Sequence, residues 1–499
     1  MGGKVTFVGA GCGDPRLLTV RAADVLAQAD FVVFDADVHP EVLTRLREGT
    51  PRHAVDPSMT AERIASLLVA EAKQGKSAVR LTWGDPLFFG LADVEGAAVA
   101  RHGVPLELVP GIGPLIAVGA FAGILLTRSN DASPSVAAVA VTSGHETLHE
   151  WQKLATATDT LAIVCDAGSV AETARSLVFY GRSSDDTVTL VENVSLPSQR
   201  VIITTLGKVP QVPRFTSRVI LVVGERAAPM RELSWLVNQP LFGKRVLVTR
   251  AREQAGSAAA LLRDRGADPL VVPTIEIHPP SDPSAMIDAV SEMGERYDWV
   301  VLTSANGVER LIAEVTRQGR DARAFGKARI AAIGPGTAAA LERGGLRADL
   351  VAKEHRQEAL AAELLAQLDP SAGAPRVLLA RAEVARDVLP DILRAAGCRV
   401  DVVSVYKTRS PPRALLEGLA ALLDAGEIDV VTFTSSSTVE HLCDALEARA
   451  ATLLARTCVA SIGPITTETA KKRGIRVDVV AAEYTILGLV TSLEKHFAK

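Results

Sequence analysis

The chain has 499 residues, which suggests about three domains if a domain has roughly 150 residues. Apolar residues make up 48% and charged residues 22%, so the composition is globular and excludes disorder, collagen and coiled coil as the main class. The 54 basic and 58 acidic residues leave a net charge of −4, and only 4% of residues are aromatic. This composition predicts no nucleic-acid surface.

Cysteines and apolar runs indicate the compartment. The five cysteines are scattered and form no CxxC pair, which fits a reducing cytosol and predicts no metal site. The N-terminus does not resemble a signal peptide. The longest apolar stretch, Gly111–Leu126, is shorter than the roughly 18 residues of a membrane helix and contains Pro114. We therefore expect a cytoplasmic protein with no membrane partner.

Apolar strand-like runs alternate with alanine-rich helical segments along the chain. In chain order, the predicted strands are Val5–Val8, Phe31–Phe34, Ala78–Leu81, Val136–Val141, Leu161–Val164, Val219–Val223, Val246–Val248, Trp299–Leu302, Arg329–Ile333, Val377–Leu379, Val430–Phe433 and Val459–Ile462. This alternation predicts an α/β fold whose parallel or mixed sheets are covered by helices. A proline-containing stretch at 226–242 predicts a linker between domains at 1–225 and 243–499.

The first half carries glycine-rich loops after its predicted strands. Residues Gly9 to Pro15 read GAGCGDP, residues 84–86 read GDP, and later segments read VPGIGP, AGILLT and TSGH. Glycine lets a backbone approach a ligand closely. Two other interpretations stay open: an ordinary strand–helix turn, and a dinucleotide site with Asp35 as the ribose-binding acid. Against the dinucleotide site, Asp14 stands where its fingerprint requires glycine.

Taken together and in this order, these loops resemble the tetrapyrrole (corrin/porphyrin) methyltransferase family over residues 3–225, most closely its uroporphyrinogen-III C-methyltransferases. The resemblance implies a two-domain α/β enzyme that uses S-adenosylmethionine to convert uroporphyrinogen III to precorrin-2, with association into a homodimer through this domain. The implied cofactor-binding residues are Gly9, Gly11, Gly13, Asp14, Pro15, Gly84, Asp85, Pro86 and Thr127.

The substrate side of that family pattern is altered here. Leu91 stands in place of an arginine and Val94 in place of an acid. The Asp-Arg pair after the second strand reads Asp35-Ala36, and the arginine of a Thr-His-Arg triplet is displaced to Arg128. We expect Arg128 to take over carboxylate anchoring or proton removal, as a catalytic residue.

The second half contains an internal duplication. RVLVTRA recurs as RVLLARA, DWVVLTSANGVERL as DVVTFTSSSTVEHL, and AAIGPGTAAALERGG as ASIGPITTETAKKRG, in the same order. Two similar lobes leave a cleft between them, which is a favoured ligand site. Hydroxyl residues recur at strand-to-helix turns in both copies, where they suit an anion with many carboxylates: Thr303, Ser304, Thr337, Thr434, Ser435 and Thr466. Plain helix capping is the alternative.

This half resembles the uroporphyrinogen-III synthase family over residues 243–499, on its LTSANGV, IGPGTAAAL, VYKT, FTSSSTV and IGPITTETA segments. The implied fold has lobe one at 243–274 plus 408–499 and lobe two at 277–404, joined by a two-stranded ladder. The implied reaction closes hydroxymethylbilane to uroporphyrinogen III with loss of water, without a cofactor. Tyr406 matches the family tyrosine that assists departure of the hydroxyl, and the hydroxyl residues above would line the substrate cleft.

The product of the second half would be the substrate of the first, so the two resemblances support each other. They predict a bifunctional enzyme of tetrapyrrole biosynthesis on the way to sirohaem or cobalamin. The alternative is a synthase whose first half is a degenerate regulatory module that binds S-adenosylmethionine or a tetrapyrrole. A dinucleotide-dependent oxidoreductase is a third interpretation.

Overall fold

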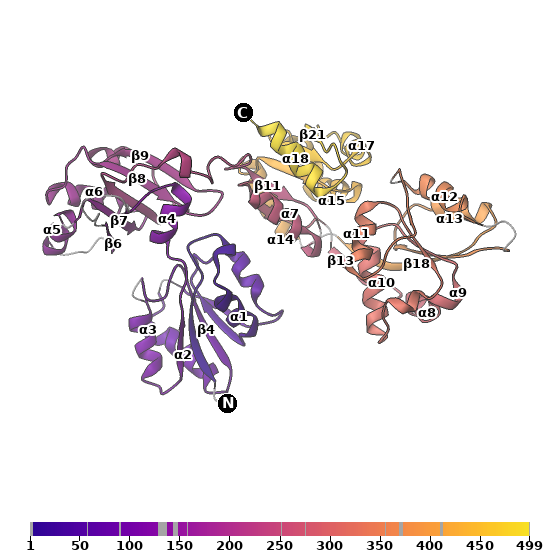
Figure 1. The fold of residues 1–499 in the computed structure, drawn as a ribbon, viewed down its shortest axis with the longest axis horizontal. Coiled ribbons are helices and arrows are strands. Elements are labelled where there is room, and N and C mark those ends of the chain that lie inside the picture. Colours follow the sequence, from indigo (N-terminus) through magenta and orange to yellow (C-terminus); the bar gives the residue numbers. More distant parts are fainter. Residues whose placement is uncertain are drawn as a thin grey trace. The chain divides into compact units, whose positions relative to one another are not determined.

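A computed structural model describes residues 3–56, 58–88, 91–127, 137–142, 148–156, 158–250, 252–274, 276–354, 356–368, 373–409 and 413–498. The chain forms two compact units (Figure 1): Met1–Lys244 with Arg265–Asp268, and Arg245–Asp264 with Pro269–Lys499. Within the described residues, no helix is long and apolar enough to cross a membrane.

The first unit begins with a parallel sheet of strand order β3-β2-β4-β1-β5. Its strands are β1 Lys4–Gly9, β2 Phe31–Phe34, β3 Arg52–Ala54, β4 Ser77–Thr82 and β5 Leu106–Val109. Its helical segments are η1 Pro15–Leu17, α1 Val20–Gln28, η2 Pro40–Arg45, α2 Ala61–Ala72, α3 Leu91–Ala100 and α4 Pro114–Ala122. Strand β1, with fully buried Val5, Phe7 and Val8, lies inside the sheet between β4 and β5. Because the three strands are parallel, the loops that follow them leave from one edge.

A mixed sheet of order β6-β7-β10-β8-β9 completes the first unit. Its strands are β6 Ala137–Thr142, β7 Thr160–Cys165, β8 Thr187–Glu192, β9 Arg200–Thr205 and β10 Val219–Gly224. Its helical segments are α5 Leu148–Thr156, α6 Val170–Phe179 and η3 Leu206–Gln211. Helix α4 packs on this sheet, because Leu115 and Val118 share a core with Ala162, Val164 and Ile220.

The predicted linker is packed against the first unit. It contains the short η4 segment, Arg231–Leu233. The Trp235 indole donates a hydrogen bond to the Ala120 carbonyl (2.9 Å), and its ring lies 5.4 Å from that of Phe121. The Met230 amide donates to the carbonyl of Gly123, which ends α4. The end of α4 is therefore fixed by the segment that leads into the second unit.

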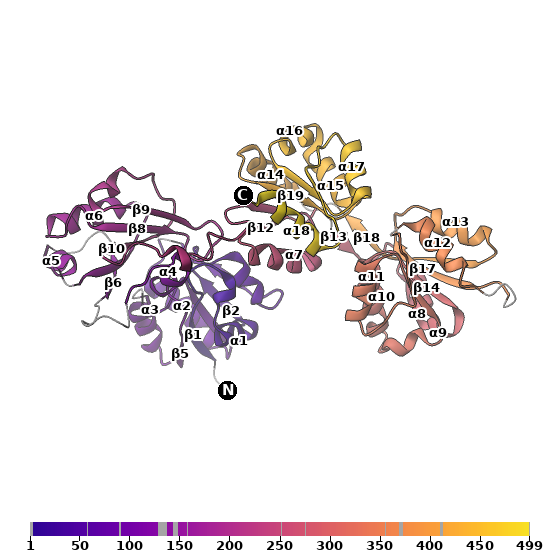
Figure 2. The ribbon, with the colours of Figure 1, turned by 45° about the horizontal axis from the view of Figure 1, so that its top comes forward.

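The second unit holds two lobes, each built on its own sheet (Figure 2). In lobe one the order is β12-β11-β19-β20-β21, with β11 Arg245–Val248, β12 Asp268–Val271, β19 Val430–Phe433, β20 Cys458–Ser461 and β21 Val479–Val480. Its helical segments are α7 Arg252–Asp264, α14 Arg413–Asp424, α15 Ser436–Leu446, η6 Glu447–Arg449, α16 Ala450–Leu454, α17 Pro464–Lys472 and α18 Ile486–Phe497.

In lobe two the order is β13-β18-β17-β14-β15-β16. The strands are β13 Glu276–His278, β14 Trp299–Leu302, β15 Arg329–Ala332, β16 Leu350–Val351, β17 Arg376–Ala382 and β18 Arg399–Arg409. The helical segments are α8 Ser284–Ser291, α9 Met293–Arg296, α10 Ala305–Arg317, η5 Ala322–Phe325, α11 Pro335–Arg343, α12 Gln357–Leu365 and α13 Val388–Ala395.

The lobes have matching topology, which confirms the predicted duplication and α/β class. The run β18-β17-β14-β15-β16 repeats β12-β11-β19-β20-β21 position by position. Antiparallel pairing of β13 with the end of β18, Glu276 opposite Arg409 and His278 opposite Lys407, forms the ladder where the chain passes between lobes (Figure 2).

Candidate functional site

The glycine loops of the first unit meet where β1 and β4 end side by side. Gly11 and Gly84 form a two-residue bridge: the Gly84 amide donates to the Gly11 carbonyl (2.9 Å), and the Gly11 amide donates back (3.2 Å). Both have positive φ, +81° and +69°, which favours glycine. A Cβ on Gly9 would lie 2.5 Å from the Gly111 nitrogen. The close approach that these glycines permit is thus between loops of the chain itself.

The two aspartates of the GDP motifs have structural partners. Asp85 accepts hydrogen bonds from the Leu87 and Phe88 amides (2.9 and 3.1 Å) and from the Gly111 amide (3.0 Å). Buried Asp14 accepts from the Arg16 amide and pairs with its guanidinium (both 2.9 Å). Each carboxylate therefore holds its own loop in shape. Pro15 opens η1, and the Pro86 carbonyl accepts the Ala92 amide at the start of α3.

Asp35, the acid of the dinucleotide interpretation, belongs to a buried ion cluster. Arg80, 1% exposed, pairs with Asp35 (2.7 Å) and with both oxygens of Glu95 (2.7 and 3.1 Å). The second Asp35 oxygen accepts the Trp83 amide (2.9 Å). With both oxygens engaged, Asp35 anchors β2 to β4.

The remaining methyltransferase positions lie on or beyond α3 and α4. Thr127 is exposed five residues after α4 ends, and Val94 on α3 is half exposed. Leu91 opens α3. Arg128 lies outside the described residues, so its catalytic role stays a prediction.

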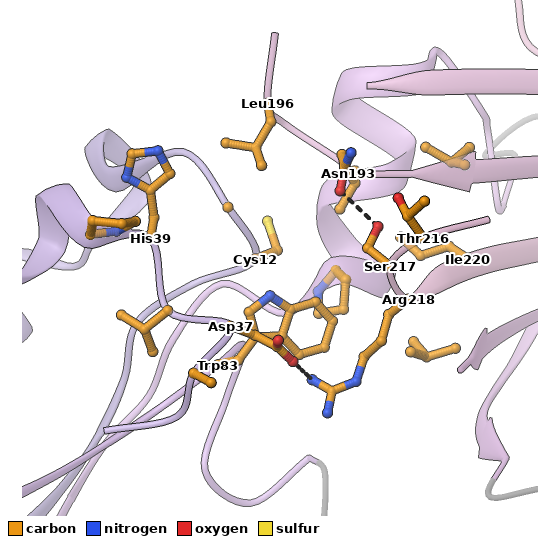
Figure 3. A pocket seen from close by; sticks show the side chains of 18 residues that line it. Cys12, Asp37, His39, Trp83, Asn193, Leu196, Thr216, Ser217, Arg218 and Ile220 are labelled. Carbon is orange, nitrogen blue, oxygen red and sulfur yellow. Dashed lines mark hydrogen bonds and ion pairs between the residues drawn. The ribbon is translucent and has the colours of Figure 1, made fainter. Parts of the chain in front are cut away.

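A cavity of about 310 Å³ lies between the two sheets of the first unit (Figure 3). One wall comes from the first sheet's loops: Cys12, Gly13, Ala36 to Pro40, Trp83 and Pro114. The other comes from β7, β8, β10 and their loops: Val164, Val191, Asn193, Val194, Leu196, Thr216 to Arg218 and Ile220. Gly13 is the lining residue that belongs to the predicted cofactor set, and Ala36 the one that belongs to the altered substrate positions.

Polar groups in this cavity come from loops that no motif marks. Arg218 pairs with Asp37 across it (3.0 Å), and the Ser217 hydroxyl donates to Asn193 Oδ1 (2.8 Å). Asn193 and Ser195 have positive φ, 55° and 71°, an uncommon strain for residues other than glycine. Strained backbone beside a cavity makes the loop of Asn193 and Ser195 a functional candidate. Sequence patterns do not reveal backbone strain of this kind.

The cysteine in the cavity wall is protonated. Burial raises the pKa of the Cys12 thiol, against the lowering effect of its contact with Ser195. A thiol is a weak nucleophile. Cys12 therefore contributes an apolar surface to the wall.

In the second unit, Tyr406 and Ser304 meet. The Tyr406 hydroxyl lies 3.1 Å from Ser304 Oγ, and the side chain is 8% exposed within the core of lobe two. Ser304 caps α10 by accepting the Gly307 amide (3.0 Å). Burial raises the pKa of Tyr406, while hydrogen bonds with Ser304 and Asn306 lower it. The net rise keeps this phenol protonated, so it can donate a proton or hydrogen bond.

The other predicted hydroxyl residues stand at equivalent turns of the two lobes. Thr303 follows β14 and Thr434 follows β19, with both side chains partly exposed. Ser435 caps α15 in a reciprocal pair with Thr438. Thr337 and Thr466 are nearly buried in the first turns of α11 and α17. Capping accounts for Ser304 and Ser435, and substrate contact by any of these residues stays a prediction.

The chain matches two family models in tandem. The tetrapyrrole (corrin/porphyrin) methylase model matches residues 4–210, and the uroporphyrinogen-III synthase HemD model matches residues 256–491. The chain is therefore a tetrapyrrole-biosynthesis enzyme with a methylase domain and a synthase domain. It is 30% identical over 507 residues to the porphyrin biosynthesis protein HemD of Ruminiclostridium josui, covering 98% of this chain and 97% of that one. The chain belongs to the family of that protein.

Other relatives match about half of the chain. Siroheme synthase 2 of Yersinia pestis (strain Pestoides F) is 36% identical over 249 residues, 48% of this chain and 52% of that one, so this chain spans about half its length. A crystal structure of uroporphyrin-III C-methyl transferase from Thermus thermophilus, complexed with S-adenosyl homocysteine, is 32% identical with a TM-score of 0.39, covering 45% of this chain and 98% of that one.

Proposed function

We propose that the chain catalyses two consecutive steps. The second unit closes hydroxymethylbilane to uroporphyrinogen III, with inversion of the last ring and loss of water. The first unit methylates that product with S-adenosylmethionine to give precorrin-2. The observation that carries the proposal is the match over 98% of this chain to a porphyrin biosynthesis protein. The tandem family matches, one in each unit, support this division of the two steps.

For the synthase step, the Tyr406–Ser304 pair supplies the acid. Departure of the hydroxyl from hydroxymethylbilane needs a hydrogen-bond or proton donor at the leaving oxygen. Tyr406 keeps its proton because it is buried, and Ser304 Oγ, held by the Gly307 amide, fixes the direction of the phenol. Hydroxyls and backbone amides at the starts of α10, α11, α15 and α17 would bind substrate carboxylates.

For the methyltransferase step, the first unit offers a cavity of suitable size and chemistry. Its volume of about 310 Å³ falls at the lower end of the roughly 300–1,000 Å³ of small-molecule sites. Aromatic, aliphatic, hydroxyl and amide groups line it, as an adenosyl group would require. Gly13 and the other lining residues would hold S-adenosylmethionine there, and bound S-adenosylmethionine would supply the methyl group as an electrophile.

A regulatory first unit is the second candidate. It is favoured by the apolar substrate positions: Ala36 lines the cavity, and Val94 is 54% exposed without a charge. Such a unit would bind S-adenosylmethionine or a tetrapyrrole without transferring the methyl group.

One experiment separates these functions. The purified chain is incubated with hydroxymethylbilane, with and without S-adenosylmethionine, and the products are resolved by chromatography. We expect uroporphyrinogen III in both reactions and precorrin-2 only with S-adenosylmethionine. Uroporphyrinogen III alone in both, with S-adenosylmethionine bound in calorimetry, would favour the regulatory unit. The type I isomer alone would exclude the synthase step.

A further inference from the structure

We propose that Arg218 is a carboxylate-binding residue of the cavity in the first unit. The proposal rests on the proposed function, because the carboxylate belongs either to a side chain of the tetrapyrrole or to the amino-acid end of S-adenosylmethionine. Among the described residues that line the cavity, Arg218 is the one arginine or lysine. It precedes β10 and reaches from the second sheet toward the loop after β2, where Ala36 lacks the cation that the methyltransferase resemblance would place there (Figure 3).

The guanidinium is held in a defined orientation. Its carbon lies 4.8 Å from the centre of the Trp83 ring, so the indole covers one face. Nη1 pairs with Asp37 Oδ2 (3.0 Å), and Nε lies 3.5 Å from Asp166 Oδ1. A guanidinium carries five N–H donors and binds carboxylates edge-on. Arg218 thus presents its edges, rather than its face, to groups at the cavity.

Its present partners can be exchanged. The side chains of Asp37 and Asp166 are 57% and 67% exposed, and that of Arg218 is 41% exposed. Ion pairs with such access to water contribute little to stability. A ligand carboxylate could therefore displace Asp37 from Arg218 at little cost in free energy, and the Asp37 carboxylate would then be hydrated.

The backbone that carries Arg218 is fixed. Glu192, 4% exposed, accepts the amides of Thr216 (2.6 Å) and Ser217 (3.0 Å), the two residues before Arg218. The Ser217 hydroxyl donates to Asn193 Oδ1. Arg218 is therefore a long side chain on a rigid base, as an anchor for a ligand requires.

The test measures binding of three probes to the full chain by calorimetry or fluorescence quenching. Uroporphyrin III carries the tetrapyrrole carboxylates, S-adenosylhomocysteine carries an amino-acid carboxylate, and 5′-methylthioadenosine has the same nucleoside without a carboxylate. The variants are Arg218→Gln and Asp37→Asn. The matched control is Arg329→Gln, because Arg329 lies 4.3 Å from the Trp299 ring in the second unit.

We expect Arg218→Gln to weaken binding of the carboxylate ligand roughly 10- to 100-fold, the usual effect of losing a charged hydrogen-bond partner. Asp37→Asn should bind it at least as tightly as the unaltered chain, and Arg329→Gln should change nothing. If Arg218→Gln loses affinity for uroporphyrin III alone, the tetrapyrrole is the source of the carboxylate. Loss for S-adenosylhomocysteine but not 5′-methylthioadenosine identifies the amino-acid carboxylate.

Three outcomes would overturn the proposal. One is unchanged binding of both carboxylate probes to Arg218→Gln, which leaves the proposed function intact. Another is that Arg218→Gln weakens the binding of 5′-methylthioadenosine equally, or that Asp37→Asn loses as much affinity for the carboxylate probes as Arg218→Gln does. Either result would indicate a purely structural ion pair. The third is failure of the unaltered chain to bind either carboxylate probe, which also overturns the proposed methyltransferase step.

Discussion

Tyr406 is the single side chain on which the proposed synthase chemistry most depends. Tyr406→Phe keeps the ring in the lobe-two core and removes the hydroxyl that lies 3.1 Å from Ser304 Oγ. We expect the rate of uroporphyrinogen III formation to fall roughly 10- to 1,000-fold, at or just below the usual contribution of about 10²- to 10⁴-fold from general-acid catalysis. The measurement is the initial rate with hydroxymethylbilane, corrected for spontaneous closure to the type I isomer.

Tyr297 provides the matched control within the same lobe. Its hydroxyl donates to Asp401 Oδ2 (2.8 Å), and the residue is 2% exposed. Tyr297→Phe removes a hydrogen bond to a carboxylate, at a stability cost of about 1.5–3 kcal/mol. If both variants lose the same fraction of the rate, Tyr406 acts in packing and the catalytic assignment is wrong.

Gly9, a glycine of the predicted cofactor motif, lies where neighbouring backbone leaves no room for a side chain. A Cβ at this position would meet backbone atoms of Gly111 and Gly84 at 2.5–2.6 Å, and backbone cannot move aside easily. We expect Gly9→Ala to lower the free energy of unfolding by at least the roughly 1–3 kcal/mol of an overpacked core. Denaturant titration checks this, with Gly168→Ala as the control, because nothing lies within 4 Å of a Cβ there. Equal stability of both variants would contradict the loop-packing explanation.

At the scale of elements, the end of β8 clamps the loop that enters β10. Burial raises the pKa of Glu192, but the Thr216 and Ser217 amides and Arg200 lower it more, so the folded value lies below the ordinary 4.5. The ionised form is therefore favoured in the folded state. Its contribution to stability is complete above about pH 4.5 and is lost as the pH falls through the lower folded value.

We expect Glu192→Gln to reduce the free energy of unfolding by about 1–3 kcal/mol at pH 7, since partly buried donors lose an ionised acceptor. The difference from the unaltered chain should shrink as the pH falls from 5 toward 3. Denaturant titrations at several pH values measure this. A difference that is constant over this range would show that the Glu192 charge does not hold the loop.

The elements that the sequence predicts well are those whose burial is periodic or complete. Strands Phe31–Phe34 and Trp299–Leu302 have the predicted bounds, because uninterrupted apolar runs fit the interior of a covered sheet. Val430–Phe433 also has the predicted bounds, although buried Thr432 interrupts its apolar run. Strand β8 has no such run: the hydroxyl of its buried Thr189 donates to the Ala227 carbonyl, 38 residues away. Strand β9 lies at a sheet edge and is half exposed, which blurs its pattern.

The cavity of the first unit could not be predicted for a similar reason. The glycine loops are contiguous motifs at the end of a strand, so the sequence places them at the sheet edge. Asp37, Asn193 and Arg218 come from separate loops, and only the packing of the two sheets brings them together. Ser304, directly after β14, and Tyr406, within β18, both stand in segments that the sequence marks, but only the packing of lobe two brings them into contact.

At the scale of the whole molecule, the boundary between units follows Lys244, and the second unit has its own cores. The sheet of lobe one forms only when β11 pairs with β19, where Leu247 lies opposite Val431, 184 residues later, so both ends of this half are needed. We expect a fragment of residues 243–499 to fold and to convert hydroxymethylbilane to uroporphyrinogen III without S-adenosylmethionine. The full chain under the same conditions is the control. A folded fragment, verified by a cooperative unfolding transition, that yields only the type I isomer would show that the synthase assignment is wrong.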